Sequence, residues 1–424
     1  MELDTLELPK TIIPLLEKTH AASAEVRRLN DAQKKGILNR LAEVLVENTE
    51  QIITENQKDL ISMDSSDPRY DRLKLTEARI QDLAISLREI AALPDPSGQI
   101  FLEKELDNGL KIKKIAVPMG VVGVIYEARP NVTIDVTALC LRSGNAVVLR
   151  GGSDAFTTNS FLVNLIHKVL RGFGVNTNCI ALIPPDRALI KELLTATRYV
   201  DLIIPRGSES LIQFVRKHSL VPTIETGAGV CHTYVETTAD LRKAAEIVIN
   251  AKVSRPSVCN SLDTIVVDEA IAKTFLPMLK EGFLKWNVEI FADEISYKIF
   301  SDIGYLHLQK ATQDDFGREF LDYKCSVKVV NGFSEAITHI NKYSSRHSEA
   351  IISQNQEYCE KFIQEVDTAA VYTNASTRFT DGGQFGLGAE IGISTQKLHA
   401  RGPFALEKLV TEKWIITGDG QIRP

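Results

Sequence analysis

The stretch from Ala251 to Asn260 has the composition of a loop that presents a reactive cysteine. Arg255 precedes Pro256, and the residue before a proline is disfavoured in the helical conformation, so the helix expected before this point should end here. Cys259 then lies between that helix and an apolar run typical of a strand. Positive charge on Lys252 and Arg255, with free backbone N–H groups, would favour its thiolate form and make it a nucleophile. The local sequence leaves one alternative open, which is a buried and unreactive cysteine packed in a loop.

A second stretch, Ile224 to Gly229, places an acidic residue next to two glycines. Because glycine has no Cβ, a flat ring or another backbone segment can approach closely here. Glu225 is therefore a candidate general base or hydrogen-bond acceptor. The alternative is an ordinary solvated carboxylate in a linker.

Two further turns have the features of phosphate sites. An apolar run that ends at Arg150 leads into a Gly-Gly-Ser turn, and a guanidinium beside free N–H groups can bind phosphate. Gly207 and Ser208 repeat this arrangement before an expected helix, whose N-terminus favours anions. Two such turns in one sheet predict a dinucleotide, although no G-x-G-x-x-G fingerprint follows a strand. An arginine solvated at the end of a strand is the alternative for Arg150.

The elements that must position these residues follow an α/β pattern. Residues 10–95 show helical periodicity, and an alternating stretch around Asn108-Gly109 predicts a β-hairpin that projects outward. Short apolar runs then alternate with helical stretches in two successive series, which indicates two parallel, doubly wound sheets. We expect strands at 121–126, 146–149, 180–183, 202–204, 264–267, 288–291, 326–330, 350–353, 369–372 and 409–417, and helices at 132–141, 157–170, 187–197, 209–217, 270–283, 333–341 and 356–366. Two such units predict a ligand cleft, and Cys259 lies close in sequence to their junction.

Composition and charge exclude several classes of protein. The chain has 424 residues, of which 44% are hydrophobic and 25% charged, and its net charge of −6 gives no electrostatic case for binding nucleic acid or an anionic membrane. No apolar run approaches the roughly 20 residues of a membrane span, and Met1 to Lys10 lacks the pattern of a secretory signal. The six cysteines are scattered without a C-x-x-C pair, so we expect no disulfide framework, no metal site and a cytoplasmic location.

Several motifs around these candidates occur together in one known family. They are GVVGVIYEARPN at 120–131, IETGAGVCH at 224–232, NAKVSRPSVCN at 250–260, the stretch 330–351 with HSE at 347–349, and QFGLGAEIGIS at 384–394. With these motifs the chain resembles the aldehyde dehydrogenase superfamily and, within it, the gamma-glutamyl phosphate reductases. The resemblance covers nearly the whole chain.

The resemblance implies an aldehyde-dehydrogenase-like α/β fold, with two doubly wound parallel-sheet domains and a protruding β-hairpin for oligomerisation. It implies a cofactor-binding domain at 1–103 and 117–225 and a catalytic domain at 226–406. The segments 104–116 and 407–424 would form the oligomerisation hairpin and tail.

The same resemblance implies catalytic and cofactor-binding roles for seven positions. Cys259 falls at the family's nucleophile, Glu225 at the glutamate of its E-L-G-G motif, and Asn131 at its oxyanion asparagine. The positions implied to bind the cofactor are Arg150 at the adenosine ribose, Gly207 and Ser208 near the pyrophosphate, and Asp322 at the nicotinamide ribose. No role for a metal is implied.

The implied reaction is the NADPH-dependent reduction of L-glutamyl 5-phosphate to L-glutamate 5-semialdehyde in proline biosynthesis, through a thioester and a thiohemiacetal on Cys259. Arg255, Ser257, Arg129 and Lys252 are then candidates for the anionic groups of the substrate, and Glu349 for its amine; ordinary structural charges are the alternative for each. The resemblance also implies a homo-oligomer, with an upstream glutamate 5-kinase as a candidate partner. Two other functions stay open, a hydrolytic aldehyde dehydrogenase and a non-catalytic nucleotide-binding scaffold.

Overall fold

The computed structural model describes residues 9–64 and 67–423 of the chain. They form two compact units. Unit 1 contains the described residues up to Thr226, Gly386–Gly392 and residues 404–423, and unit 2 contains Gly227–Phe385 and Ile393–Pro403. The expectation that Met1 to Lys10 forms no secretory signal falls mostly on residues 1–8, which lie outside the described residues.

Unit 1 begins with helices that pack on one another, as the helical periodicity of residues 10–95 predicts. These helices are α1 (Ile13–Val26), α2 (Asp31–Glu47), α3 (Thr49–Ile61), α4 (Pro68–Leu73) and α5 (Glu77–Ala92). A capping box starts α2, because the Asn30 side chain accepts the Gln33 N–H and the Gln33 side chain accepts the Asn30 N–H. The buried face of α2 then contacts α5 and α7.

A parallel sheet forms the centre of unit 1, in the order β5-β4-β3-β6. Its elements are β3 (Val121–Tyr126), α6 (Pro130–Ser143), β4 (Ala146–Arg150), α7 (Phe156–Gly172), β5 (Ile180–Leu182), α8 (Arg187–Thr195), β6 (Leu202–Arg206) and α9 (Glu209–His218). Strands β3 and β4 are buried along their whole length, which explains their continuous apolar sequences. The chain places β4 and β5 on one side of β3 and β6 on the other, so the carboxyl ends of β3 and β6 mark the point where a doubly wound sheet binds ligands.

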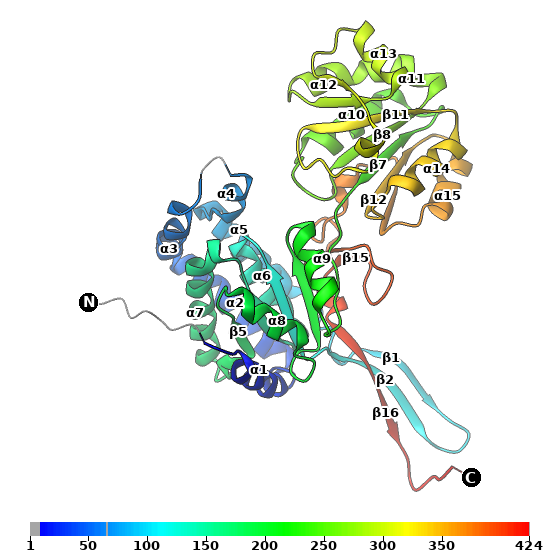
Figure 1. The fold of residues 1–424 in the computed structure, drawn as a ribbon. Coiled ribbons are helices and arrows are strands. Elements are labelled where there is room, and N and C mark those ends of the chain that lie inside the picture. The colour runs from blue at the N-terminus through cyan, green and yellow to red at the C-terminus, as the bar shows by residue number, and fades with distance from the viewer. Residues whose placement is uncertain (1–8, 65–66, 424) are drawn as a thin grey trace. The chain divides into compact units, whose positions relative to one another are not determined.

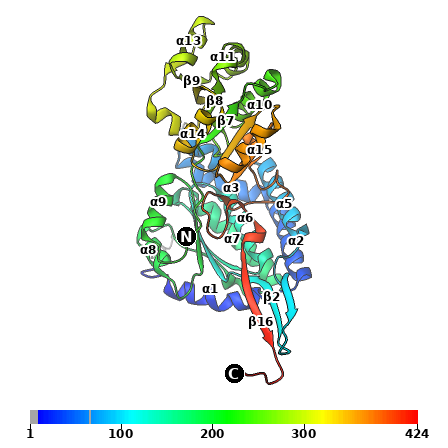
Figure 2. The same cartoon turned by 90° about the vertical axis from the view of Figure 1, so that its right-hand side faces the viewer.

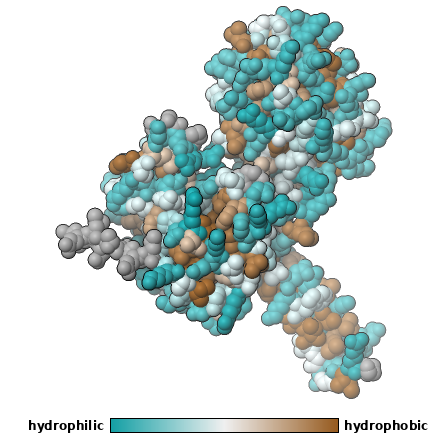
Figure 3. Space-filling view, in the orientation of Figure 1, coloured by the Kyte–Doolittle hydropathy of each residue, from teal (hydrophilic) through white to brown (hydrophobic). Residues whose placement is uncertain are grey.

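An antiparallel arm extends from the helices of unit 1 (Figures 1 and 2). Strand β1 (Ile100–Glu105) pairs with β2 (Lys111–Pro118), and β2 also pairs with the late strand β16 (Val410–Thr417). The hairpin is longer than the predicted segment 104–116, because β1 begins at Ile100, which pairs with Ile115, and β2 continues to Pro118. Figure 3 shows hydrophobic residues exposed along this arm. Phe101 on β1 and Trp414 and Ile416 on β16 are exposed apolar side chains.

Unit 2 is built on a second parallel sheet, with the described order β10-β9-β11-β8-β7-β12-β13. Its strands are β7 (Cys231–Val235), β8 (Leu262–Asp268), β9 (Glu289–Ala292), β10 (Leu308–Lys310), β11 (Lys324–Val330), β12 (Ser348–Ile352) and β13 (Ala370–Thr373). Its helices are α10 (Leu241–Val253), α11 (Glu269–Phe275), α12 (Lys280–Leu284), α13 (Glu294–Asp302), α14 (Phe333–Tyr343) and α15 (Gln356–Glu365). Ile265 and Val267 pack in the core under α10 and α11, whereas Val266 packs in a core with α14 and α15, so both faces of the sheet are covered.

The structure confirms the predicted α/β fold with two parallel sheets and corrects several details. Strand β7 and helix α13 were not predicted, and the helix expected over 270–283 is divided into α11 and α12 by a 3₁₀ turn that contains Pro277. Residues 386–392 and 404–406, which the sequence assigned to the catalytic domain, belong to unit 1. Gly388 there packs on Ile90 and Leu93 at the end of α5. Within residues 392–404, strands β14 (Gly392–Ser394) and β15 (Gly402–Phe404) form a two-stranded sheet.

Three possible features are absent from the described residues. No helix among them is long and apolar enough to cross a membrane. Within residues 9–64 and 67–423, no three His, Cys, Asp or Glu side chains are arranged to hold a metal ion. No cysteine in the described part of the chain forms a disulfide, and Cys259 is the one among them that is only partly buried.

Candidate active site

The backbone of Cys259 packs against Gly229. A Cβ atom added to Gly229 would lie 1.6 Å from the carbonyl oxygen of Cys259 and 2.8 Å from its Cα, so this position requires glycine. Gly229 lies just before β7 and Cys259 just before β8, which are neighbouring parallel strands. The beginning of the sheet therefore fixes the cysteine loop against a second backbone segment.

A second cysteine, Cys231, contacts the same loop. Its Sγ donates a hydrogen bond to the carbonyl oxygen of Cys259 at 3.2 Å. Burial, with a smaller contribution from the negative charge of Glu349, raises the pKa of the Cys231 thiol well above its ordinary value. Cys231 therefore keeps its proton and acts as a donor, whereas the partly buried Cys259 is the accessible thiol. The structure thus excludes the alternative of a fully buried Cys259.

Asn260 anchors the end of the cysteine loop. Its Nδ2 donates to the carbonyl oxygen of Thr380 at 2.8 Å, and the Thr377 hydroxyl donates to the Asn260 carbonyl at 2.8 Å. Arg255 and Ser257 lie exposed on the loop before Cys259. The structure therefore brings these two predicted substrate residues onto one loop with the predicted nucleophile, and their roles stay predictions.

Glu319 is a residue that the sequence reasoning missed. Its Oε1 accepts a hydrogen bond from the backbone N–H of Gly229 at 2.8 Å, and Gly229 touches the Cys259 backbone. A carboxylate is thereby placed beside the cysteine loop. The signal that the sequence offered was proximity, since Glu319 lies three residues before Asp322, the acidic residue to which a cofactor role was assigned.

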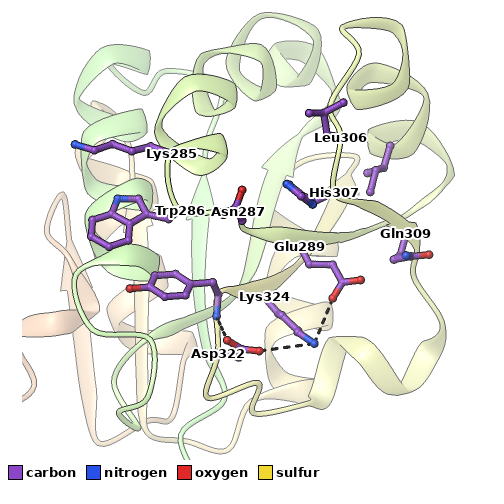
Figure 4. Close-up of a pocket in the computed structure, with 11 residues that line it drawn as sticks. Lys285, Trp286, Asn287, Glu289, Leu306, His307, Gln309, Asp322 and Lys324 are labelled. Atoms are coloured by element: carbon purple, nitrogen blue, oxygen red, sulfur yellow. Dashed lines mark hydrogen bonds and ion pairs between the residues drawn. The ribbon is translucent and has the colours of Figure 1, made fainter. Parts of the chain in front are cut away.

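Asp322 lies on the surface of unit 2, in the turn before β11 (Figure 4). Its carboxylate accepts the backbone N–H of Tyr323 at 2.8 Å and forms an ion pair with Lys324 at 3.7 Å. It lines a hollow of about 730 Å³ whose wall includes the stacked rings of Trp286 and Tyr323. The acidic side chain beside the cysteine loop is Glu319, so Glu319 becomes a second candidate for the role predicted for Asp322, which stays a prediction.

Two predicted substrate residues are buried inside unit 2. Glu349, on β12, accepts the backbone N–H of His232 at 2.7 Å and lies 3.1 Å from its Nδ1. This contact follows from the parallel pairing of β7 with β12, which sets the two residues opposite each other. Glu349 is fully buried and its carboxylate is already hydrogen-bonded, so its assignment to the substrate amine is wrong. Lys252 is also fully buried, with its Nζ 3.6 Å from Asp263, and does not reach a substrate anion.

The carboxyl ends of β3 and β6 meet in an anion-binding turn. The carboxylate of Glu127, just after β3, accepts the Ser208 backbone N–H at 2.8 Å and the Ser208 hydroxyl at 3.1 Å. Ser208 caps α9, and a Cβ on Gly207 would meet the Glu127 carboxylate at 2.5 Å. The turn predicted to bind pyrophosphate therefore accepts an anionic group in this structure, as a helix N-terminus should.

Arg150 ends β4 at the same edge of the sheet. Its Nη2 donates to the carbonyl oxygen of Pro185 at 3.0 Å, while its buried Nε has no hydrogen-bond partner among the described residues. Burial and the nearby charge of Arg187 lower the pKa of Arg150, and both effects would be relieved by a bound anion. The chemistry of Arg150, Gly207 and Ser208 therefore fits a phosphorylated dinucleotide, although their individual roles stay predictions.

The remaining predicted catalytic residues, Asn131 and Glu225, and the predicted substrate-binding residue Arg129 also lie in unit 1. Asn131, near the N-terminus of α6, donates from Nδ2 to Asp135 at 3.2 Å, and burial raises the pKa of Asp135 to about 6. Arg129 precedes α6 and is half-buried. Glu225 lies at the end of unit 1 with Oε1 3.7 Å from Nε of Arg216. The structure thus places these three outside the unit that carries Cys259.

We predict that His347, beside Cys231, makes the protein less stable in acid. Its Nδ1 lies 2.8 Å from the Ser348 hydroxyl, and burial lowers the pKa of His347 to about 4. The unfolded chain takes up this proton near pH 6.5, so stability is lost as the pH falls from there towards the folded-state pKa, by up to ~1.4 kcal/mol per pH unit. Thermal unfolding of His347→Asn between about pH 7 and pH 4 should therefore show a smaller loss than the wild type. The exposed His20→Asn should keep the wild-type slope, and an unchanged slope in His347→Asn would contradict the prediction.

Comparison with known proteins assigns the class. Residues 9–296 match the family model described as "Aldehyde dehydrogenase family". The chain belongs to the aldehyde dehydrogenase family, and the predicted resemblance is confirmed.

Within that family, the chain is similar to proteins named gamma-glutamyl phosphate reductase. It is 52% identical to the one from Bacteroides thetaiotaomicron over 406 residues, which cover 95% of this chain and 97% of the relative. It is 50% identical to the one from Chlorobaculum parvum over 416 residues, covering 98% and 99%. The crystal structure of the gamma-glutamyl phosphate reductase from Thermotoga maritima matches with a TM-score of 0.92 and 41% identity, covering 97% of this chain and 100% of that one.

Proposed function

We propose that this protein reduces L-glutamyl 5-phosphate to L-glutamate 5-semialdehyde and phosphate, with NADPH as the reductant, in proline biosynthesis. The observation that carries the proposal is the accessible Cys259, which lies on one loop with Arg255 and Ser257. The chain that contains this loop is about half identical to proteins named gamma-glutamyl phosphate reductase. The activity of those relatives supports the substrate, and the anion-binding turn of unit 1 supports a phosphorylated cofactor.

The reaction on Cys259 proceeds in three steps under this proposal. The thiolate attacks the acyl carbon, the bond from that carbon to the phosphate oxygen breaks, and phosphate leaves with the electron pair to give a thioester. When bound, the nicotinamide cofactor would supply hydride to the thioester carbon, and Cys259 would then carry a thiohemiacetal oxyanion. Collapse of this oxyanion breaks the carbon–sulfur bond, releases the semialdehyde and restores the thiolate.

The chain supports these steps through groups already described. The backbone N–H of Cys259 and a side-chain donor, for which Asn131 is the proposed residue, would stabilise the oxyanion. Phosphate is a good leaving group, so its departure requires no general acid. Arg255 and Ser257 would bind the phosphate, and Arg129 another anionic group of the substrate. Glu319 is a second candidate, besides Asp322, for the place near the nicotinamide ribose, since its carboxylate lies beside the cysteine loop.

Glu225 has the contact expected of a residue that does not activate water. Its carboxylate oxygen lies 3.7 Å from the Arg216 guanidinium, which competes with a water molecule for that oxygen. A hydrolytic aldehyde dehydrogenase needs a base that activates water, whereas a reductase must protect its thioester from water. We therefore propose that Glu225 is a proton shuttle or a cofactor gate.

The arm of unit 1 supports assembly of a homo-oligomer. Phe101, Trp414 and Ile416 are each about half exposed on its strands, and β1 and β16 are its outer strands. Exposed apolar side chains and unpaired strand edges are features that a second copy can cover. A cytoplasmic location and an association with glutamate 5-kinase are further proposals from the family resemblance.

Phosphate dependence tests the proposed function. In the reverse direction, the purified protein should reduce NADP⁺ with glutamate 5-semialdehyde when inorganic phosphate is present, and the rate should fall to background without phosphate. The measurement is absorbance of the reduced cofactor at matched ionic strength, with sulfate in place of phosphate as the control. Equal turnover without phosphate would identify a hydrolytic dehydrogenase instead. No turnover in either buffer, together with binding of NADPH, would favour a scaffold.

A further inference from the structure

Arg378 links the two ends of the cysteine loop. It lies on the short 3₁₀ helix Thr377–Phe379, after the last strand of the unit 2 sheet. Its Nε donates to the Ser254 hydroxyl at 3.0 Å, at the end of α10, and its Nη1 donates to Oδ1 of Asn260. Ser254 and Asn260 flank Cys259 and Arg255 in the sequence, so one guanidinium spans the whole loop.

The backbone around Arg378 strengthens the same connection. Nδ2 of Asn260 donates to the Arg378 carbonyl oxygen at 3.3 Å and to that of Thr380 at 2.8 Å. Asn260 is nearly fully buried, so these hydrogen bonds fix the residue that follows Cys259. Loss of the guanidinium would leave the Oδ1 acceptor of Asn260 without this hydrogen bond in a buried setting, which destabilises the loop.

Arg378 contacts Ser254 at 3.0 Å, and the next residue in the chain is Arg255, so the two positively charged side chains start from adjoining parts of the loop. Burial and the positive charge of Arg255 both lower the pKa of Arg378, whereas Asp381 and an ionised Cys259 raise it. Two guanidinium groups held near one another repel, and an anion between them removes this repulsion. Two anionic groups are candidates for this place. One is the Cys259 thiolate, and the other is the phosphate bonded to the acyl carbon that the thiolate attacks.

We propose that Arg378 positions Cys259 by joining Ser254 to Asn260, and that Arg378 and Arg255 together bind the phosphate group that leaves the substrate. The binding half rests on the proposed function, because it requires an acyl phosphate as substrate. The positioning half rests on hydrogen bonds within unit 2 alone. An arginine suits both tasks, since its planar fork can donate to two loop oxygens while retaining a delocalised positive charge.

Two variants separate geometry from charge. Arg378→Lys retains the positive charge but cannot span Ser254 and Asn260, and Arg378→Met removes both the charge and the hydrogen bonds. Arg401→Lys is the matched control, since Arg401 is a partly buried arginine of unit 2 that donates to the side chain and the carbonyl of Asp367. Each purified protein is measured for thermal unfolding, for the rate of Cys259 alkylation by iodoacetamide against pH, and for kcat and the KM of phosphate in the reverse reaction.

We expect the charge to govern phosphate binding and the pH dependence of the thiol. Arg378→Met should raise the phosphate KM at least about tenfold, as expected for loss of a charge-assisted hydrogen bond, and should shift the alkylation profile upward by about one pH unit. Arg378→Lys should keep the profile and change the phosphate KM less than about threefold, but should lower kcat about tenfold or more because the loop is misplaced. Arg401→Lys should behave as the wild type.

Wild-type phosphate KM and alkylation profile in a folded Arg378→Met would overturn the proposal. If Arg378→Met does not fold, the proposal is decided by Arg378→Lys, whose wild-type kcat would then overturn it. A wild-type enzyme whose rate does not depend on phosphate overturns the binding half together with the proposed function. In that case a lowered kcat of Arg378→Lys in the phosphate-independent reaction still supports the positioning half, so the two failures are distinguishable.

Discussion

Replacing Cys259 with serine should lower the reductase rate by about 10⁴-fold or more, the scale seen when the nucleophile of a covalent mechanism is removed. A serine hydroxyl matches the thiol in shape but is not ionised at neutral pH, so the loop should keep its geometry while the attack on the acyl carbon fails. The measurement is phosphate-dependent reduction of NADP⁺ with glutamate 5-semialdehyde, alongside a binding isotherm for NADPH. The isotherm should stay near that of the wild type, because the anion-binding turn lies in unit 1.

The control for this variant is Cys359→Ser. Cys359 lies on α15, and its Sγ is 3.8 Å from the Ser353 carbonyl, a contact that a hydroxyl can retain. This control should keep nearly all of the activity. Labelling with iodoacetamide gives a second readout, because the cysteines of the described chain other than Cys259 are buried. A Cys259→Ser protein with the wild-type rate would eliminate the covalent mechanism, and with it the proposed role of the loop.

Continuous apolar sequence was the most reliable guide to the fold. The strand predicted at 121–126 is β3, with the same bounds, because each residue of that run is buried between helices. The strand Cys231–Val235 escaped prediction because it contains His232 and Thr233, whose polar groups suggest a surface. These side chains are buried, and the contact that satisfies His232 comes from Glu349, far away in the sequence. Sequence periodicity cannot show a partner that only sheet pairing brings into place.

The residues of the candidate site show the same limit of sequence-based prediction. Residues next to Cys259 in the chain, such as Arg255 and Ser257, could be named from the sequence because chain connectivity already holds them near the nucleophile. Glu319 and Arg378 could not, since each reaches the loop across the fold through a hydrogen bond to Gly229 or Asn260. Glu349 was misassigned for the complementary reason. A carboxylate within a sequence motif suggests a functional role, and only the fold shows that Glu349 is buried on a strand and hydrogen-bonded to His232.

Gly229→Ala should lower activity at least about 100-fold, a loss typical when catalytic groups are displaced by about 1 Å. The added Cβ would lie 1.6 Å from the Cys259 carbonyl oxygen, far inside van der Waals contact, so one of the two backbone segments must move. Movement of Gly229 would break its N–H bond to Glu319, and movement of Cys259 would break the Cys231 thiol bond to its carbonyl. Either shift changes the direction of the nucleophile.

A matched glycine separates this effect from a general response to alanine. Gly172 is in the last turn of α7, where an added Cβ would have no atom within 4 Å, so Gly172→Ala should keep full activity and be neutral or slightly stabilising. Thermal unfolding of Gly229→Ala reports the strain, and the kinetics report the displacement of Cys259. Gly229 ends the E-T-G-A-G segment before β7, and Cys259 lies on the loop before β8. Full activity in Gly229→Ala would therefore show that these two segments are not packed together in the working enzyme. The expected loss would instead show that Gly229 supports catalysis by its backbone contact with the Cys259 loop, which leaves no space for a side chain.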